Sequence, residues 1–286
     1  MKKILLILVM TASSIALAAI TEDNPYDLSD FDKEIQLTNG SIYPNYTEAS
    51  QFGENGACEF VQDNWGWSDS NCEAVDKILY NTAPNVGLVV IEIPQKVGYV
   101  EFDDWYKDNK NDDIDEIVKE IKKVYLEQSK VLGYELKWLE WIVYPTLVED
   151  KNYMYYVYLS STDGIEAPVI AAMIYDRKGY IKFQVIPENL TLSSSEADFR
   201  NALEDALDLY TPSMGQRYAD FTQGDNIYKF GIMGSLAALA GVSWKGKGKA
   251  AAAGIFGLIL VFAKKLWWLI FLPFILLFKK IFRKKD

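Results

Sequence analysis

Hydrophobic residues in the middle of the chain follow two different spacings. Between Asp112 and Leu132 they recur every three or four residues, which predicts an amphipathic helix that ends at Gly133. Val86–Ile93 is an unbroken apolar run with several β-branched residues, which is typical of a buried strand. The central part of the chain therefore predicts a mixed core of helices and strands.

Further strand-like segments lie on both sides of the predicted helix and are joined by short links such as Asp163-Gly164. They are Glu34–Ser41, Val97–Phe102, Leu136–Leu147, Tyr153–Leu159, Pro168–Tyr175 and Tyr180–Ile186. A second helix, capped within Ser193–Ser195, is expected to end before Pro212. Short links favour antiparallel neighbours, so we predict an α+β fold in which two helices cover an antiparallel sheet. Residues 42–80 are expected to be irregular.

The first 19 residues have the pattern of a secretory signal peptide. Lys2 and Lys3 precede an apolar stretch that begins at Ile4, and Ala16-Leu17-Ala18 offers a cleavage site between small residues. An uncleaved N-terminal anchor is the alternative interpretation. Either way, the sequence predicts that residues 20–225 form an α+β domain outside the cytoplasm, at the periplasmic or extracellular face of the membrane.

Residues 226–286 are predicted to be a membrane-anchoring tail with a basic C-terminus. Three apolar pieces are separated by lysine clusters, and each is shorter than the ~20 residues that a spanning helix needs. One crossing by Tyr228–Trp244 would keep every basic cluster in the cytoplasm, and we favour it. One crossing by Ala250–Phe278, two crossings, or a buried hairpin of a soluble domain remain open. The residues expected at the membrane interface are Lys264, Lys265, Trp267 and Trp268.

Charge is divided unevenly between the tail and the rest of the chain. Of the 29 Lys and Arg residues, ten lie from Lys245 onward, whereas Asp286 is the only one of the 40 acidic residues there. The preceding part therefore carries 19 basic and 39 acidic residues, and this excess of acid argues against nucleic acid as a partner. A basic tail beside apolar runs favours an anionic lipid bilayer.

The chain contains no histidine and two cysteines. These counts exclude Ser-His-Asp and Cys-His nucleophilic sites, His-ligated zinc and an all-thiolate zinc site. We assign no catalytic residue, no metal and no cofactor. Asp103-Asp104 and Asp112-Asp113 are the densest acid pairs, and they are interpreted as solvated acids and helix caps rather than as the carboxylates of a glycoside hydrolase.

Cys58 and Cys72 are close enough in sequence to form a disulfide if the domain is exported. Two unrelated buried thiols are the alternative. Trp65 and Trp67 lie between these cysteines in a segment rich in Gly and Asn. If they are exposed they could contact a partner or a sugar ring, and if they are buried they belong to the packing of the domain.

The segment from Gly215 to Phe221, Gly-Gln-Arg-Tyr-Ala-Asp-Phe, followed by Asp225, Tyr228 and Gly231, resembles the signature of the DUF2167 family of predicted membrane-anchored prokaryotic proteins. Weaker similarities lie at Asn64-Trp65-Gly66, Gly98-Tyr99-Val100, Gly133-Tyr134-Glu135-Leu136 and Arg177-Lys178-Gly179. The resemblance implies secretion, a membrane anchor and a shared fold. It implies no activity, because the family's function is unassigned.

The residues at the centre of this signature are Arg217, Tyr218, Ala219, Asp220 and Phe221. An Arg217–Asp220 pair is expected to fix the orientation of the domain above the bilayer or to form part of a ligand-binding rim. These observations predict a membrane-anchored cell-envelope protein that acts by binding or scaffolding, with the bilayer and other membrane or envelope proteins as partners. A carboxylate-dependent hydrolase of envelope sugars and a regulatory subunit of a membrane complex are the alternatives.

Overall fold

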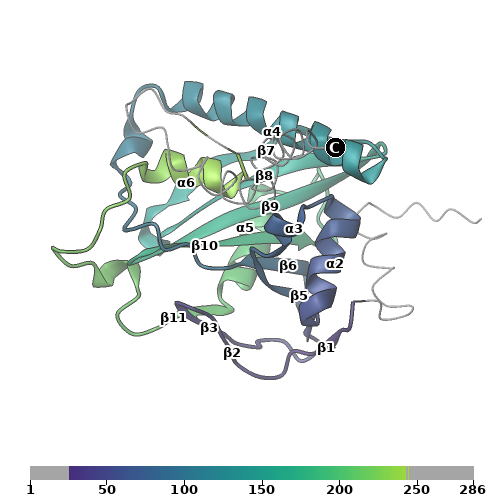
Figure 1. The fold of residues 1–286 in the computed structure, drawn as a ribbon, viewed down its shortest axis with the longest axis horizontal. Coiled ribbons are helices and arrows are strands. Elements are labelled where there is room, and N and C mark those ends of the chain that lie inside the picture. Colours follow the sequence, from purple (N-terminus) through teal and green to yellow (C-terminus); the bar gives the residue numbers. More distant parts are fainter. Residues whose placement is uncertain (1–25, 243, 245–286) are drawn as a thin grey trace, which may run out of the picture. The chain divides into compact units, whose positions relative to one another are not determined.

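The computed structural model describes residues 26–242 and 244, and its main element is an eight-stranded antiparallel sheet (Figure 1). Across the sheet the strands are β1 (Ser29–Asp30), β4 (Ser50–Gln51), β5 (Val75–Ala83), β6 (Val86–Glu92), β10 (Gly179–Pro187), β9 (Ile165–Asp176), β8 (Tyr153–Thr162) and β7 (Leu136–Val148). A smaller sheet has the order β11 (Tyr210–Pro212), β3 (Gly40–Ile42) and β2 (Ile35–Gln36). The predicted α+β class with an antiparallel sheet is confirmed.

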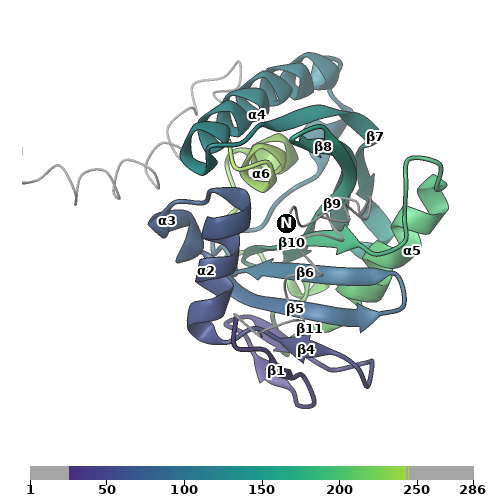
Figure 2. The same cartoon turned by 90° about the vertical axis from the view of Figure 1, so that its right-hand side faces the viewer.

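Helices cover both faces of the large sheet (Figure 2). The helices are α2 (Glu54–Trp65), α3 (Asp69–Cys72), α4 (Lys110–Leu132), α5 (Glu196–Leu207) and α6 (Gly231–Leu239), and three short 3-10 turns are η1 (Asp103–Tyr106), η2 (Glu149–Lys151) and η3 (Tyr218–Asp220). Helix α5 packs on one face, and α2, α4 and α6 lie on the other. More helices cover the sheet than the two that the sequence predicts.

Strand β6 shows why its sequence is apolar throughout. Val89 and Ile91 belong to the core that includes α5, whereas Leu88 and Val90 belong to the core that includes α2. Successive side chains of a strand point to opposite faces, so a strand covered on both faces needs an apolar residue at every position. The interpretation of this run as a buried strand is confirmed.

Both helices predicted from the sequence are present, and their ends have clear causes. Helix α4 stops at Gly133, which has φ 77° and accepts the left-handed conformation that glycine tolerates best. Helix α5 begins with a capping box, in which Ser195 Oγ accepts from the Asp198 backbone N–H and the Asp198 carboxylate accepts from the Ser195 backbone N–H.

The first hundred residues differ most from the sequence predictions. Residues 42–80 are not irregular, because they contain β4, α2, α3 and part of β5. The predicted strand Glu34–Ser41 is replaced by two short strands, β2 and β3, that pair with each other. The predicted strand Val97–Phe102 makes only a single bridge, between Tyr99 and Ile227, because the backbone of Gly98 and Tyr99 bonds to Lys178, Asn226 and Tyr228 instead of joining the ladder.

Helix α6 falls in the segment for which a membrane crossing was favoured, and it is part of the folded body instead. It has nine residues, and six consecutive ones from Ile232 to Ala237 are buried. Its small residues allow close packing within this compact unit, which extends to Val242. Among the residues that the structure describes, no helix is both long and apolar enough to cross a membrane.

The predicted signal peptide and most of the predicted tail lie outside the described residues. This includes the four residues expected at the membrane interface, Lys264, Lys265, Trp267 and Trp268.

Candidate functional site

The segment that resembles a family signature, residues 213–231, is attached to the end of the β9–β10 hairpin. The backbone of Arg177, in the turn of that hairpin, donates a hydrogen bond of 2.9 Å to the carbonyl of Gln216. Asp176 and Arg217 form an antiparallel bridge at the same point. The segment thus runs beside the hairpin turn before it reaches α6, and we call it the junction segment.

Arg177 is the centre of the polar contacts that hold the junction segment. Its Nε and a terminal nitrogen donate to both carboxylate oxygens of Asp225, at 2.7 and 2.9 Å. The same terminal nitrogen donates to Thr222 Oγ1 at 2.8 Å, and the other donates to the Gly215 carbonyl at 3.3 Å. The planar guanidinium of Arg177 therefore bonds both ends of residues 215–225 and closes them into a loop around its own side chain.

The electrostatics of this contact follow from its geometry. Hydrogen bonds from Arg177, together with those from Thr222, lower the pKa of Asp225 well below its ordinary value. The Asp225 interaction in turn raises the pKa of Arg177, which stays fully charged. Both side chains are largely covered, with 23% and 14% of their surfaces exposed, so the pair is shielded from bulk water. Its charges are satisfied within the segment, and its role is structural.

Asp176, next to Arg177, is fully buried and supports the same turn. One carboxylate oxygen accepts from Asn39 Nδ2 at 2.7 Å, and the other accepts from the Lys178 backbone N–H at 2.7 Å. Burial raises the pKa of Asp176, and these hydrogen bonds act in the opposite direction. Asp176 thus connects the small sheet, through Asn39, to the hairpin that carries Arg177.

Aromatic stacking holds the middle of the junction segment against residues 99–102. The Tyr218 ring stacks on Tyr99 at 4.4 Å and on Phe102 at 5.0 Å between centroids. Its hydroxyl donates to the carbonyl of Val100 at 2.7 Å. Burial raises the pKa of Tyr218 strongly, with Tyr99 adding to the effect, so the phenol remains protonated and serves as a hydrogen-bond donor.

The other signature residues lie at the surface. Arg217 and Ala219 are exposed, and Phe221 covers Tyr99 with a centroid distance of 4.2 Å while 37% of its own surface stays exposed. The Asp220 carboxylate accepts from the Arg217 backbone N–H at 3.0 Å, which closes the turn η3. Within the part of the chain that is described, no ion pair joins Arg217 to Asp220, and the ion pair that holds the junction segment is Arg177–Asp225.

Asp104 fixes the helix that follows the junction segment. Its two carboxylate oxygens accept from the backbone N–H groups of Ile232 and Met233, at 2.9 and 3.0 Å, at the start of α6. Gly231 has φ 56°, and a Cβ atom there would lie 2.5 Å from an Asp104 oxygen. Asp104 is therefore a helix cap from a distant part of the sequence, which agrees with the interpretation of the acid pair as solvated acids and helix caps.

A buried hydroxyl pair holds α6 to the sheet. Tyr175 on β9 and Ser235 on α6 lie 2.7 Å apart between their oxygens, and both residues are buried. Ser235 Oγ also lies 2.8 Å from the Ile232 carbonyl and donates to it, so the Tyr175 hydroxyl donates to Ser235. The end of the described chain is therefore held by three sets of contacts: the Arg177 hydrogen bonds, the Asp104 cap and the Tyr175–Ser235 pair.

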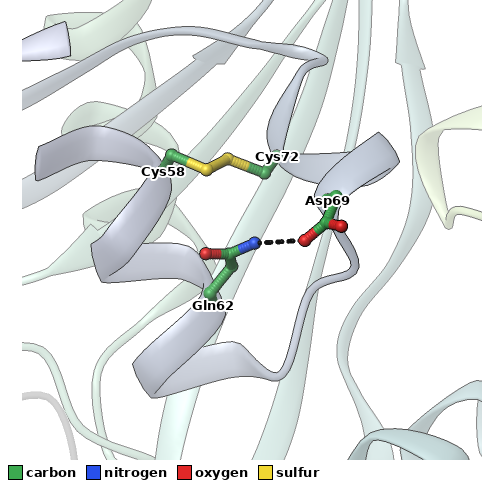
Figure 3. Close-up of a disulfide and its surroundings, with 4 residues drawn as sticks. All are labelled: Cys58, Gln62, Asp69 and Cys72. Atoms are coloured by element: carbon green, nitrogen blue, oxygen red, sulfur yellow. Dashed lines mark hydrogen bonds between the residues drawn. A yellow bond between two sulfur atoms is a disulfide. The ribbon is translucent and has the colours of Figure 1, made fainter. Parts of the chain in front are cut away.

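The two cysteines form the predicted disulfide, which joins α2 to α3 (Figure 3). Gln62 Nε2 donates to Asp69 across the same two helices at 3.0 Å. Trp65 and Trp67 are half-buried and contact each other, with centroids 5.6 Å apart, beside the apolar core under α2. Packing accounts for their position, and a partner contact at these residues stays a prediction.

Arg177 belongs to the family-like stretch Arg177-Lys178-Gly179, and the sequence pattern predicts no role for it. Its partner Asp225 is 48 residues away, and no local pattern indicates that the two meet. Within residues 26–242, no group of three or more Asp, Glu or Cys side chains is arranged to hold a metal ion.

Comparison with known proteins gives one match. A family model described as a protein of unknown function, DUF2167, matches residues 32–275, which is most of the chain. The comparisons with curated proteins and with solved structures found no match.

Proposed function

Because this chain belongs to the DUF2167 family, whose function is unassigned, we propose from its own sequence and structure that it is an exported binding module tethered to a membrane by its C-terminal tail. The folded body presents a ligand- or partner-binding surface at the membrane, and residues 1–19 direct its export. Residues 245–286, the last part of the tail, carry apolar pieces and ten basic residues, which suit an anionic bilayer.

The observation that carries the proposal is the firm attachment of the chain just before the tail. The junction segment is held by Arg177, and α6 is held by Asp104 and by the Tyr175–Ser235 pair. Besides stabilising the fold, these contacts fix the point from which the chain continues toward the proposed anchor.

Charge supports the same proposal. Residues 1–244 carry an excess of 20 acidic over basic side chains, since 39 are acidic and 19 are basic. Repulsion from anionic headgroups would keep such a body off the bilayer surface, whereas the basic tail is attracted to it. The chain would thus have a tail that binds the membrane and a body that stays accessible to ligands and partners.

Fractionation of bacterial cells that express the full chain tests this proposal. The full chain should remain with membranes after an alkaline wash and require detergent for release. A matched chain that stops after Trp244 should be released without detergent from the extracytoplasmic compartment. Recovery of the unprocessed full chain from the cytosol without detergent would overturn the proposal.

A further inference from the structure

An open cleft of about 790 Å³ lies between the second half of α4, the start of β7 and the β8–β9 turn. Its walls are held in place by specific contacts. Ser129 Oγ accepts from the backbone N–H of Leu136 at 2.8 Å, which ties α4 to β7. The Tyr134 hydroxyl donates to the carbonyl of Asn64 at the end of α2, at 3.0 Å. These contacts fix the positions of the elements that form the cleft.

Three lysines surround the cleft: Lys122, Lys130 and Lys137. Lys137 is paired with Glu135 at 2.7 Å, and the other acid of the cleft, Asp163, accepts the Glu135 backbone N–H. No ion pair in residues 26–242 engages Lys122 or Lys130. These two ammonium groups form a local positive edge on an otherwise acidic body, which favours an anionic ligand.

The floor of the cleft is aromatic and has an unused donor. Trp138 is 7% exposed, and its indole Nε1–H has no acceptor among the described residues. The ammonium of Lys122 lies 5.1 Å from the centre of the Trp138 ring. Buried N–H groups are nearly always paired, so this indole N–H is a donor that a bound ligand or a water molecule can satisfy once the flexible Lys122 side chain moves aside.

We propose that this cleft binds an acidic glycan, with sugar rings against the aromatic floor and carboxylates at Lys122 and Lys130. The two lysines are eight residues apart on α4, which places them about 12 Å apart along the helix axis. That separation suits a chain with repeated acidic groups better than one small anion. The inference deepens the proposed function, on whose binding role it rests, by naming a ligand class.

Other anionic ligands fit the cleft less well. A lipid tail needs an enclosed apolar cavity, whereas this cleft is open and polar at its rim. Nucleic acid depends for its affinity on the neutralisation of many phosphates, and two free lysines supply little of that. An acidic peptide matches the charge but makes little use of the aromatic floor, and it is therefore the comparison in the test.

Isothermal titration of the full chain in a nonionic detergent tests the proposal, with a defined oligogalacturonate as the probe. We expect saturable binding that weakens at least tenfold in Lys122→Gln/Lys130→Gln and several-fold in Trp138→Phe. Lys123→Gln is the matched control, because Lys123 is on the same helix, is paired with Glu120 and does not line the cleft. The basic tail is present in every variant, so its contribution cancels.

An uncharged galacto-oligosaccharide of equal length should bind at least tenfold more weakly, and so should a polyglutamate of equal charge. Absence of oligogalacturonate binding, unchanged affinity in the double lysine variant, or equal binding of polyglutamate would each overturn the proposal. Thermal melts of the variants establish that they are folded. If the chain binds no glycan but still sediments with membranes, the proposed glycan site is wrong and the proposed membrane anchor is unaffected.

Discussion

At the scale of single residues, the planar fork of Arg177 determines how the junction segment is closed. Arg177→Lys keeps the charge but cannot bond both oxygens of Asp225 and also reach Thr222 and Gly215. We therefore expect a lower urea midpoint for the variant in equilibrium unfolding followed by circular dichroism.

The matched control is Arg217→Lys, in the same segment. Arg217 is exposed, and the described residues offer it no ion pair, so this variant should keep the midpoint of the unaltered chain. Equal midpoints for the two lysine variants would show that the guanidinium fork of Arg177 contributes nothing to the fold.

The importance of Arg177 illustrates what sequence reasoning misses at this scale. The signature draws attention to Arg217 and Asp220 because they are close together in sequence. In the structure Arg177 meets Asp225 across 48 positions. A pairing of this kind depends on how the β9–β10 hairpin is folded against residues 213–231, and short-range spacing carries no information about it.

At the scale of elements, the contact between α6 and β9 depends on one pair of hydroxyls. Ser235→Ala leaves the buried Tyr175 hydroxyl without an acceptor, which should cost about 1–3 kcal/mol of unfolding free energy. Adding Tyr175→Phe removes the orphaned hydroxyl, so the double variant should be no less stable than Ser235→Ala. Urea unfolding of the single and double variants measures this coupling. Strictly additive losses would contradict the assigned hydrogen bond.

Helix α5 is joined to the sheet through Glu204. Burial alone would raise the pKa of Glu204, but hydrogen bonds from Lys151, Arg200 and Tyr153 outweigh it and lower the pKa from 4.5 to about 2. A folded-state pKa below the unfolded one stabilises the fold above about pH 4.5, and this contribution is lost as the pH falls toward 2. After allowance for solvent screening, we expect Glu204→Gln to cost about 1 kcal/mol at pH 7.

The measurement is the unfolding free energy of both proteins between pH 7 and pH 2. The difference should narrow as the pH falls through this window, because the carboxylate then becomes protonated in the unaltered chain. Glu120→Gln is the comparison, since Glu120 pairs with Lys123 on the exposed side of α4. If the difference in unfolding free energy between the unaltered chain and Glu204→Gln stays constant from pH 7 to pH 2, the assigned role of the carboxylate is wrong.

Elements with a strong and regular pattern could be predicted, and those shaped by distant contacts could not. Strands β7 to β10 and helix α4 have long periodic sequences, and all were predicted close to their observed bounds. Helix α2 has a mixed sequence, and the disulfide and the core beneath it stabilise it. The sequence of α6 is apolar and rich in small residues, which suggests a membrane segment, but distant contacts with Asp104 and Tyr175 hold it against the body.

At the scale of the whole molecule, the disulfide reduces the freedom of the unfolded chain. Cys58 and Cys72 are 14 positions apart, and closing a loop of this length stabilises the fold by about 3 kcal/mol in the chain-entropy model. Cys58→Ser/Cys72→Ser should lose a large part of that free energy in urea unfolding. Addition of a reductant should lower the midpoint of the unaltered chain but leave that of the double variant unchanged.

The same disulfide connects the fold to the compartment in which it forms. Disulfides persist in oxidising compartments and are rare in the cytosol, where thiols are kept reduced. If residues 1–19 direct export, both cysteines of the full chain should resist alkylation by a maleimide-polymer reagent after denaturation. A chain that begins at residue 20, behind a new initiator methionine, should stay in the cytosol and gain two labels, which a gel shift resolves. Two labels on the full chain would show that the disulfide does not form there, and no label on the shortened chain would show that it forms without export. Either result would contradict the link between the disulfide and export, which is the main structural support for an extracytoplasmic body.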